Sequence, residues 1–389
     1  MLARNFANPN STFKEGTMAI SRRGFLTTVS TGVAASALLP EFIFAGEPQR
    51  AHPSGGNIIL DSNENAYGAP DSARKAMREA LAVANRYPHD GMYQGLIDRI
   101  AKIHKVSSEQ VVLGCGSGEL LRNCVTAFCA PKTQVITPSP TFESLGRHAE
   151  VAGMKVSRVP LAKDFSHDLG AMMAAVSGDT SLVYICNPNN PTGSITPRKD
   201  IEAFLAKLPE HVTVVLDEAY HHFADSSEYV SFLDKPIARE RLVILRTFSK
   251  IFGMAGLRIG YSVANKSMSD QLFRSGFLDN VNCVAAVSAT AAMDDAVFLA
   301  PAVQRNKKDR EEFLRQASTR KLSFIPSQTN FVMVDSKRPV REVIKHFRDN
   351  SIRVGRPFPP YDTHVRISLG LPEEMVEFWR VWDKMPAKA

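Results

Sequence analysis

Seven short runs rich in apolar and β-branched residues alternate with helix-like segments between residues 111 and 264. Most of the runs are continuously apolar, which is typical of strands covered on both faces, and their alternation with helices favours a mainly parallel sheet. The predicted strands are Val111–Leu113, Gln134–Thr137, Lys155–Val159, Ser181–Cys186, Val212–Leu216, Leu242–Thr247 and Arg258–Ala264. The sequence therefore predicts an α/β protein, in which ligands bind beyond the carboxyl ends of the strands.

Polar side chains with distinct chemistry follow three of these runs. They are Asn190 after the fourth run, Asp217 and Tyr220 after the fifth, Lys250 after the sixth, and Arg258 eight positions later. Each one alone has an ordinary explanation, such as a surface lysine, a helix N-cap or a turn asparagine. An amide, a carboxylate, a phenol, an amine and a guanidinium in this series instead suit one cofactor, pyridoxal 5'-phosphate (PLP).

At these motifs the chain resembles the fold type I PLP-dependent aminotransferases of class I/II, and within them the histidinol-phosphate aminotransferase branch. The resemblance runs from about Ile58 to the C-terminus. It implies a large PLP-binding domain at residues 81–301, with a mainly parallel seven-stranded sheet. It also implies a smaller α/β C-terminal domain at residues 302–389, entered through a long charged helix near Ala302–Arg320, and an N-terminal segment at residues 46–80 that packs with the small domain.

The resemblance assigns catalytic and ring-binding roles. Lys250 is the amine expected to form the Schiff base with the cofactor aldehyde and then to move the substrate Cα proton. Asp217 is expected to face the pyridine nitrogen and keep it protonated, while Tyr220 and Asn190 hydrogen-bond the phenolic oxygen of the ring. Phe142 fits the ring-stacking position, and a core phenylalanine is the alternative explanation for it.

A second group of residues is expected to bind the cofactor phosphate. A glycine-rich turn lies between an apolar strand and a helix-like segment, where free backbone amides bind phosphate well; a simple tight turn is the alternative. The predicted phosphate ligands are Gly116, Ser117, Gly118, Thr247, Ser249 and Arg258. In the family a tyrosine of the neighbouring subunit also reaches this phosphate, and Tyr67 occupies that motif position. The resemblance thus implies a homodimer with shared active sites.

Substrate recognition follows the family in one residue and departs from it in another. Arg366 matches the arginine that binds the substrate α-carboxylate, and Asn330 is expected near the same entrance. The histidinol-phosphate enzymes use a further arginine toward the substrate phosphate. An ungapped alignment puts Gly355 at that place, and Arg356 fits only with a one-residue shift. This departure argues for an amino compound other than histidinol phosphate.

The N-terminus carries a twin-arginine motif, Ser21–Leu26, followed by an apolar stretch of small residues from Val29 to about Phe44. The pattern predicts a Tat signal peptide over residues 1–45, cleaved after Ala45. We therefore expect export through the Tat translocon to the periplasm. An arginine pair before a chance apolar run is the alternative, and either Met1 or Met18 can be the start.

Charge and cysteine content limit the other partners. The formal net charge of the 389 residues is +7, but the basic residues are scattered, so no nucleic-acid partner is predicted. Five cysteines occur without a CxxC pattern, and no metal-ligand spacing is found. We expect buried free thiols for most of them and no metal site.

The main functional prediction is transamination between an amino acid or amine and a 2-oxo acid. A decarboxylase or lyase on the same scaffold is an alternative, because these motifs specify the cofactor more tightly than the bond that is broken. An exported binding protein without catalysis is a further alternative. The complete set of Lys250, Asp217, Tyr220 and Arg258 disfavours it.

Overall fold

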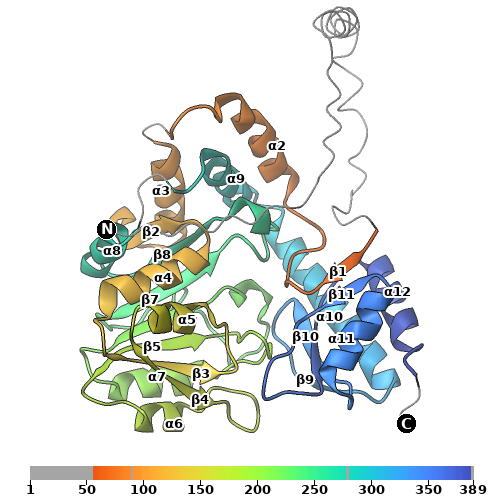
Figure 1. The fold of residues 1–389 in the computed structure, drawn as a ribbon. Helices are drawn as coiled ribbons and strands as arrows, with labels where there is room; N and C mark the ends of the chain where they lie inside the picture. The colour runs from red at the N-terminus through yellow and green to blue at the C-terminus, as the bar shows by residue number, and fades with distance from the viewer. Residues whose placement is uncertain (1–55, 89–90, 277–279, 387–389) are drawn as a thin grey trace, which may run out of the picture. The chain divides into compact units, whose positions relative to one another are not determined.

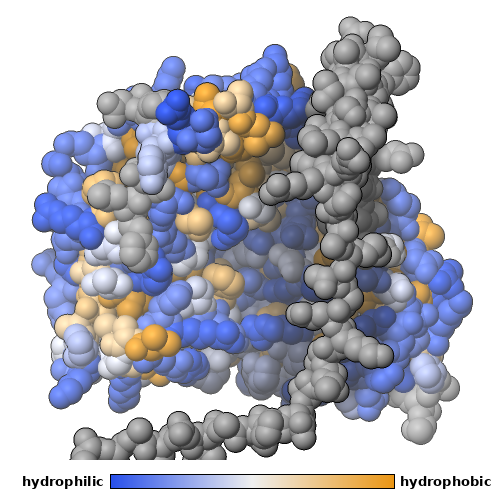
Figure 2. All heavy atoms as spheres, turned by 45° about the horizontal axis from the view of Figure 1, so that its top comes forward, coloured by the Kyte–Doolittle hydropathy of each residue, from blue (hydrophilic) through white to orange (hydrophobic). Residues whose placement is uncertain are grey.

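The computed structural model describes residues 56–88, 91–276 and 280–386, which lie in one compact unit, Ser54–Ala389. The predicted Tat signal peptide lies outside the described residues. Figure 1 shows a large sheet with helices on both faces beside a set of C-terminal helices and strands. On the face seen in Figure 2, polar and charged residues predominate, and apolar residues form separate patches, as on most folded proteins.

The large sheet has seven strands in the order β2-β8-β7-β6-β5-β3-β4. Its members are β2 (Val111–Gly114), β3 (Gln134–Ser139), β4 (Lys155–Pro160), β5 (Thr180–Cys186), β6 (Thr213–Asp217), β7 (Leu242–Thr247) and β8 (Gly260–Val263). Strands β3 to β7 pair in parallel, whereas β8 runs antiparallel to both of its neighbours. The predicted α/β fold with a mainly parallel seven-stranded sheet is confirmed.

Two apolar cores cover the two faces of this sheet, because successive side chains of a strand point in opposite directions. In β6, Val214 and Leu216 belong to one core and Val215 to the other. The helices associated with the sheet are α3 (Met92–His104), α4 (Ser117–Phe128), α5 (Ser144–Val151), α6 (Leu169–Ala174), α7 (Arg198–Lys207), α8 (Lys266–Arg274) and α9 (Cys283–Asp294). Burial on both faces explains the continuously apolar runs in the sequence.

The C-terminal elements have their own core, which includes stacked and edge-to-face aromatic rings such as Phe347 and Phe378. They are α10 (Leu299–Thr319), β9 (Ser323–Ile325), β10 (Phe331–Asp335), α11 (Val340–Asp349), β11 (Ile352–Val354), β12 (His364–Ser368) and α12 (Pro372–Trp382). Strands β12, β10 and β9 form an antiparallel sheet. Helix α10 matches the long charged helix that the sequence predicted.

The described part of the predicted N-terminal segment makes two kinds of contact. Strand β1 (Ile58–Leu60) pairs in parallel with β11, so it joins the C-terminal elements. Helix α2 (Asp71–Ala80) instead packs on α9 and contributes Ala73 to a core of the large sheet. The segment therefore connects both groups of elements.

Short 3-10 turns complete the described structure: η2 (Leu81–Val83), η3 (Ser108–Gln110), η4 (His221–Phe223) and η5 (Ala255–Leu257). The last of them explains one difference from the sequence prediction. Arg258 follows η5 with a left-handed backbone (φ 55°), which a strand residue does not adopt, so β8 begins two residues later at Gly260.

Candidate active site

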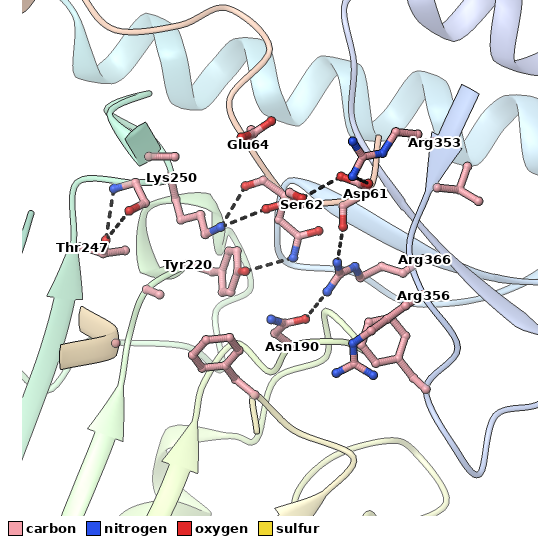
Figure 3. A pocket seen from close by; sticks show the side chains of 18 of the residues that line it. Asp61, Ser62, Glu64, Asn190, Tyr220, Thr247, Lys250, Arg353, Arg356 and Arg366 are labelled. Carbon is pink, nitrogen blue, oxygen red and sulfur yellow. Dashed lines mark hydrogen bonds and ion pairs between the residues drawn. The ribbon is translucent and has the colours of Figure 1, made fainter. Parts of the chain in front are cut away.

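A cavity of about 970 Å³ lies at the carboxyl ends of β5, β6 and β7 and reaches the C-terminal elements. This is where ligands bind in parallel α/β sheets. Of the residues predicted from sequence, it is lined by Ser117, Gly118, Phe142, Asn190, Asp217, Tyr220, Thr247, Ser249, Lys250, Arg258 and Arg366. Figure 3 shows that side chains from the large sheet and from the C-terminal elements face one another across it.

Asp217 ends strand β6 at the floor of the cavity and is 2% exposed. Its Oδ2 accepts a hydrogen bond from the Tyr184 hydroxyl at 2.9 Å, and its Oδ1 accepts one from the Ala219 N–H at 3.1 Å. Burial raises the pKa of this carboxyl to about 6, although the two hydrogen bonds oppose the shift. A buried carboxylate without a full counter-charge is a suitable partner for a protonated ring nitrogen.

Lys250 lies three residues beyond β7 and points across the cavity (Figure 3). Its Nζ donates to the carbonyl oxygens of Ser62 at 3.3 Å and Asn63 at 3.1 Å. Burial lowers the pKa of the amine to about 8, and repulsion from the Arg366 guanidinium adds to this shift. A fraction of the amine is therefore neutral near pH 7 and can act as a nucleophile.

Tyr220 presents its hydroxyl to the same space. The hydroxyl accepts a hydrogen bond from Asn63 Nδ2 at 3.0 Å, and burial raises its pKa, so it remains protonated. Asn63 is buried and adopts a left-handed backbone (φ 54°), in which its N–H donates to Ser368 Oγ at 2.8 Å. Asn63, which follows β1, is therefore hydrogen-bonded to both Ser368 of β12 and Tyr220.

The glycine turn before α4 forms a cradle with the side chains that follow β7. Gly116 has a left-handed backbone (φ 76°), and a Cβ added there would collide with the guanidinium of Arg258. Arg258 Nη1 lies 3.4 Å from Ser249 Oγ, which in turn accepts a hydrogen bond from Thr247 Oγ1 at 3.0 Å. A helix N-terminus, two hydroxyls and a guanidinium converge here, and this donor set fits a phosphate group.

Arg366 of β12 enters the cavity from the opposite side and is 6% exposed. Its Nη1 donates to Asn190 Oδ1 and its Nη2 to the Asp61 carbonyl, both at 2.6 Å. Its Nε has no hydrogen-bond partner among the described residues. A buried guanidinium with an unused donor fits a carboxylate ligand. The Asp61 carboxylate itself pairs with Arg353 at 2.7 Å.

Gly355 is the residue that the ungapped alignment puts at the place of the family arginine. A Cβ added there would lie 2.7 Å from the carbonyl oxygen of Arg366 and 3.0 Å from its Cβ, so the close packing requires glycine. The cavity is lined instead by Arg356, whose guanidinium lies 4.3 Å from the centroid of the Phe358 ring. It also forms a 2.9 Å ion pair with Glu143, the residue before α5.

Three predicted site residues, Gly116, Tyr67 and Asn330, are not among the residues that line this cavity. The Tyr67 hydroxyl donates to Asp309 Oδ2 at 3.1 Å, and Arg305 lies over the ring, at a second, smaller pocket. Burial raises the pKa of Tyr67 to about 12. Asn330 lines the same small pocket and donates to the carbonyl oxygens of Asn63 at 3.1 Å and Glu64 at 3.0 Å. Its contacts position the loop that carries Asn63.

Among the residues that were not predicted from the sequence, Asp61, Asn63 and Tyr184 form hydrogen bonds with side chains of the site. The first two follow the short apolar strand β1, and a polar run directly after a strand was an available signal. Tyr184 lies inside an apolar run, where a tyrosine is easily interpreted as a core residue.

The arrangement of this sheet and cavity is that of a fold type I PLP-dependent enzyme. The model of the family "Aminotransferase class I and II" matches residues 56–378. The chain belongs to this family. It is a PLP-dependent aminotransferase, as the sequence predicted, and its cofactor is PLP.

Individual relatives support the same assignment. The histidinol-phosphate aminotransferase of Bacillus subtilis (strain 168) is 36% identical over 322 residues, which are 82% of this chain and 89% of that protein. Histidinol-phosphate aminotransferase 2 of Haemophilus influenzae Rd is 37% identical over 332 residues, 85% of this chain and 90% of that protein.

Solved structures agree with the fold. A putative histidinol-phosphate aminotransferase from Erwinia carotovora atroseptica superposes with a TM-score of 0.79 at 33% identity, over 84% of this chain and 94% of that one. The Sinorhizobium meliloti histidinol-phosphate aminotransferase, solved in complex with PLP, gives 0.77 at 28% identity, over 82% and 88%.

Proposed function

We propose that this protein is an exported aminotransferase that moves an amino group between an amino acid or amine and a 2-oxo acid. The observation that carries the proposal is that Lys250, Asp217 and Arg366 face one cavity from two groups of elements. When bound, PLP supplies an aldehyde and an electron-withdrawing ring. All other parts of the reaction depend on residues of the chain.

Each of the central side chains has one task. Lys250, with a pKa lowered to about 8, supplies the attacking amine and later holds the proton taken from the substrate Cα. Asp217 holds the proton on the ring nitrogen, and Tyr220 with Asn190 donates hydrogen bonds toward the phenolic oxygen. Arg366 binds the substrate carboxylate and thereby orients the Cα–H bond toward the lysine.

Two sets of residues would hold the cofactor in place, one at its phosphate and one at its ring. The backbone of Gly116, Ser117 and Gly118, the hydroxyls of Thr247 and Ser249, and the Arg258 guanidinium would bind the phosphate. Phe142 lines the cavity and is 39% exposed, so its ring is available for stacking on the cofactor.

The substrate proposed here is an amino compound other than histidinol phosphate. The relatives are named for histidinol phosphate, but an ungapped alignment puts Gly355 at the place of the family arginine, and Gly355 packs on Arg366. Arg356, which lines the cavity, is paired with Glu143, and Glu143 also pairs with Arg147. A substrate side chain near Arg356 would therefore meet a guanidinium that already has a carboxylate partner.

We also propose a homodimer exported by the Tat route. Tyr67 lies outside the cavity of its own chain, which is compatible with the family role of reaching the phosphate of a partner subunit. Export rests on the twin-arginine motif and the apolar stretch after it. Strand β1 begins at Ile58, so cleavage after Ala45 would leave every described element intact.

The test of the reaction is an absorbance experiment on the purified protein loaded with PLP. We expect a visible band that bleaches when a suitable amino donor is added and returns with a 2-oxo acid. Lys250→Ala should abolish the band and reduce turnover by at least about a thousandfold, because the nucleophile and the base are both removed.

Lys266→Ala is a matched control, because this lysine is 56% exposed and pairs with Glu109 outside the cavity. It should behave as the unchanged protein. Turnover that survives in Lys250→Ala would exclude the proposed chemistry. Export is tested by Arg22→Lys together with Arg23→Lys, which should keep the chain in the cytoplasm of a Tat-competent bacterium.

A further inference from the structure

A fully buried tyrosine lies directly beneath the catalytic carboxylate. Tyr184 of β5 is 0% exposed, and its hydroxyl donates to Asp217 Oδ2 at 2.9 Å. The contact follows from the sheet register. Strands β5 and β6 are parallel neighbours with Cys186 beside Asp217, so Tyr184, two residues earlier on β5, points to the same face.

We propose that Tyr184 is a positioning residue that fixes the Asp217 carboxylate toward the ring nitrogen of the cofactor. Its hydroxyl holds one carboxylate oxygen while the Ala219 N–H holds the other, so the plane of the carboxylate is set before the cofactor arrives. The inference rests on the proposed cofactor site and goes beyond it by assigning a role to a residue outside the cavity wall.

Packing alone does not explain a tyrosine at this position. The ring lies in the apolar core that also contains Leu182, Val215 and Val243, where a phenylalanine would fill the same volume. Burial of a hydroxyl is unfavourable unless it is hydrogen-bonded, and Asp217 provides that partner. Burial also raises the pKa of Tyr184, so the hydroxyl keeps its proton and acts as a donor at every working pH.

The hydrogen bond affects where a proton resides. A carboxylate that accepts a bond from Tyr184 is less basic, so a proton shared with the ring nitrogen stays on the nitrogen. The titratable groups around Asp217 are Tyr184 and Cys186 from β5, Cys124 from α4, Glu218 and Tyr220 from its own segment, and Lys250 after β7. Of these, Tyr184 is the one that donates a side-chain hydrogen bond to Asp217.

The test compares Tyr184→Phe with Tyr229→Phe. The Tyr229 hydroxyl is buried without a hydrogen-bond partner among the described residues, so its removal is the same chemical change without the proposed contact. In Tyr184→Phe the proton should shift toward Asp217, and the ring should withdraw electrons less strongly. The pH midpoint of the visible band of bound PLP should rise by about one unit, and the Kd for PLP should increase about tenfold. Tyr229→Phe should change neither.

A double-mutant cycle separates positioning from a general structural effect. In the background of Asp217→Asn, the change Tyr184→Phe should have little further effect on the Kd for PLP, because the carboxylate that Tyr184 positions is already absent. The same loss in both backgrounds would overturn the inference, as would a Tyr184→Phe midpoint equal to that of Tyr229→Phe. A missing visible band in the unchanged protein would overturn the proposed function instead.

Discussion

Asp217 and Glu218 are consecutive, both are buried, and they lie in opposite electrostatic situations. Glu218 forms a 2.8 Å ion pair with Arg246 and accepts further bonds from the Ser231 hydroxyl at 2.7 Å and the Phe232 N–H at 2.9 Å. Its charge is fully compensated inside the protein. This cluster joins β6, β7 and the loop that follows η4.

Asp217 has a different set of partners. Two neutral donors, Tyr184 and Ala219, hold it, and it forms no ion pair among the described residues. A buried charge with complete compensation serves the fold, whereas a buried charge with incomplete compensation is available for a ligand.

The largest expected effect is on stability, at Glu218. Glu218→Ala would leave the Arg246 guanidinium buried and unpaired, which costs about 3–5 kcal/mol of unfolding free energy. Chemical denaturation should show this loss with and without PLP. Glu79→Ala, which removes a 67% exposed carboxylate from α2, should change stability by less than about 1 kcal/mol. Similar losses of stability in Glu218→Ala and Glu79→Ala would contradict the structural role of Glu218.

Asp217→Asn should have the opposite effect on the protein without PLP. The folded-state pKa of about 6 lies above the ordinary value of 3.8, so the folded protein is penalised for ionising this carboxyl. The penalty is absent below pH 4, grows as pH rises to 6, and then stays constant. Asn removes it, so the cofactor-free variant should gain up to about 3 kcal/mol at pH 8 and nothing at pH 4.

Urea unfolding of the cofactor-free protein at the two pH values measures this difference. The same variant should bind PLP weakly and lose most of its turnover. A gain that is equal at pH 4 and pH 8 would contradict the explanation by ionisation.

The third effect is on the rate of cofactor loading. Because the neutral amine of Lys250 attacks the aldehyde and its pKa is lowered to about 8, loading should accelerate about tenfold per pH unit below 8 and level off above it. Growth of the visible band after mixing with PLP measures the rate. Arg366→Met should move the midpoint upward, because the Arg366 charge helps to lower this pKa. A midpoint that stays in place would show that burial alone sets it.

The smallest effect on stability is expected for the ion pair between Arg356, which lines the cavity, and Glu143. Arg356 and Glu143 are about half exposed, and the second partner of Glu143, Arg147, is more exposed still, so Glu143→Gln should cost less than about 1 kcal/mol. The released Arg356 should raise kcat/KM for amino donors with an anionic side chain by about three- to tenfold relative to neutral donors. An equal change for both kinds of donor would show that the pair has no part in substrate selection.

The strands of the large sheet were predictable because burial on both faces leaves continuous apolar runs, and the place of Lys250 at the cavity was predictable from its motif. The contacts that Tyr184 and Asn63 make were not. Their partners Asp217 and Tyr220 lie 33 and 157 residues away, so the contacts depend on strand register and on a loop in a left-handed conformation. Arg258 shows the same limit, since a single positive φ moved the start of β8.

Gly355 has a consequence for how this cavity can change over evolutionary time. An arginine at that position would place its Cβ 2.7 Å from the Arg366 carbonyl oxygen, so the first effect would be displacement of Arg366. A lineage that carries this glycine could accept an arginine at position 355 only after the backbone around Arg366 had moved, so one substitution would not be enough.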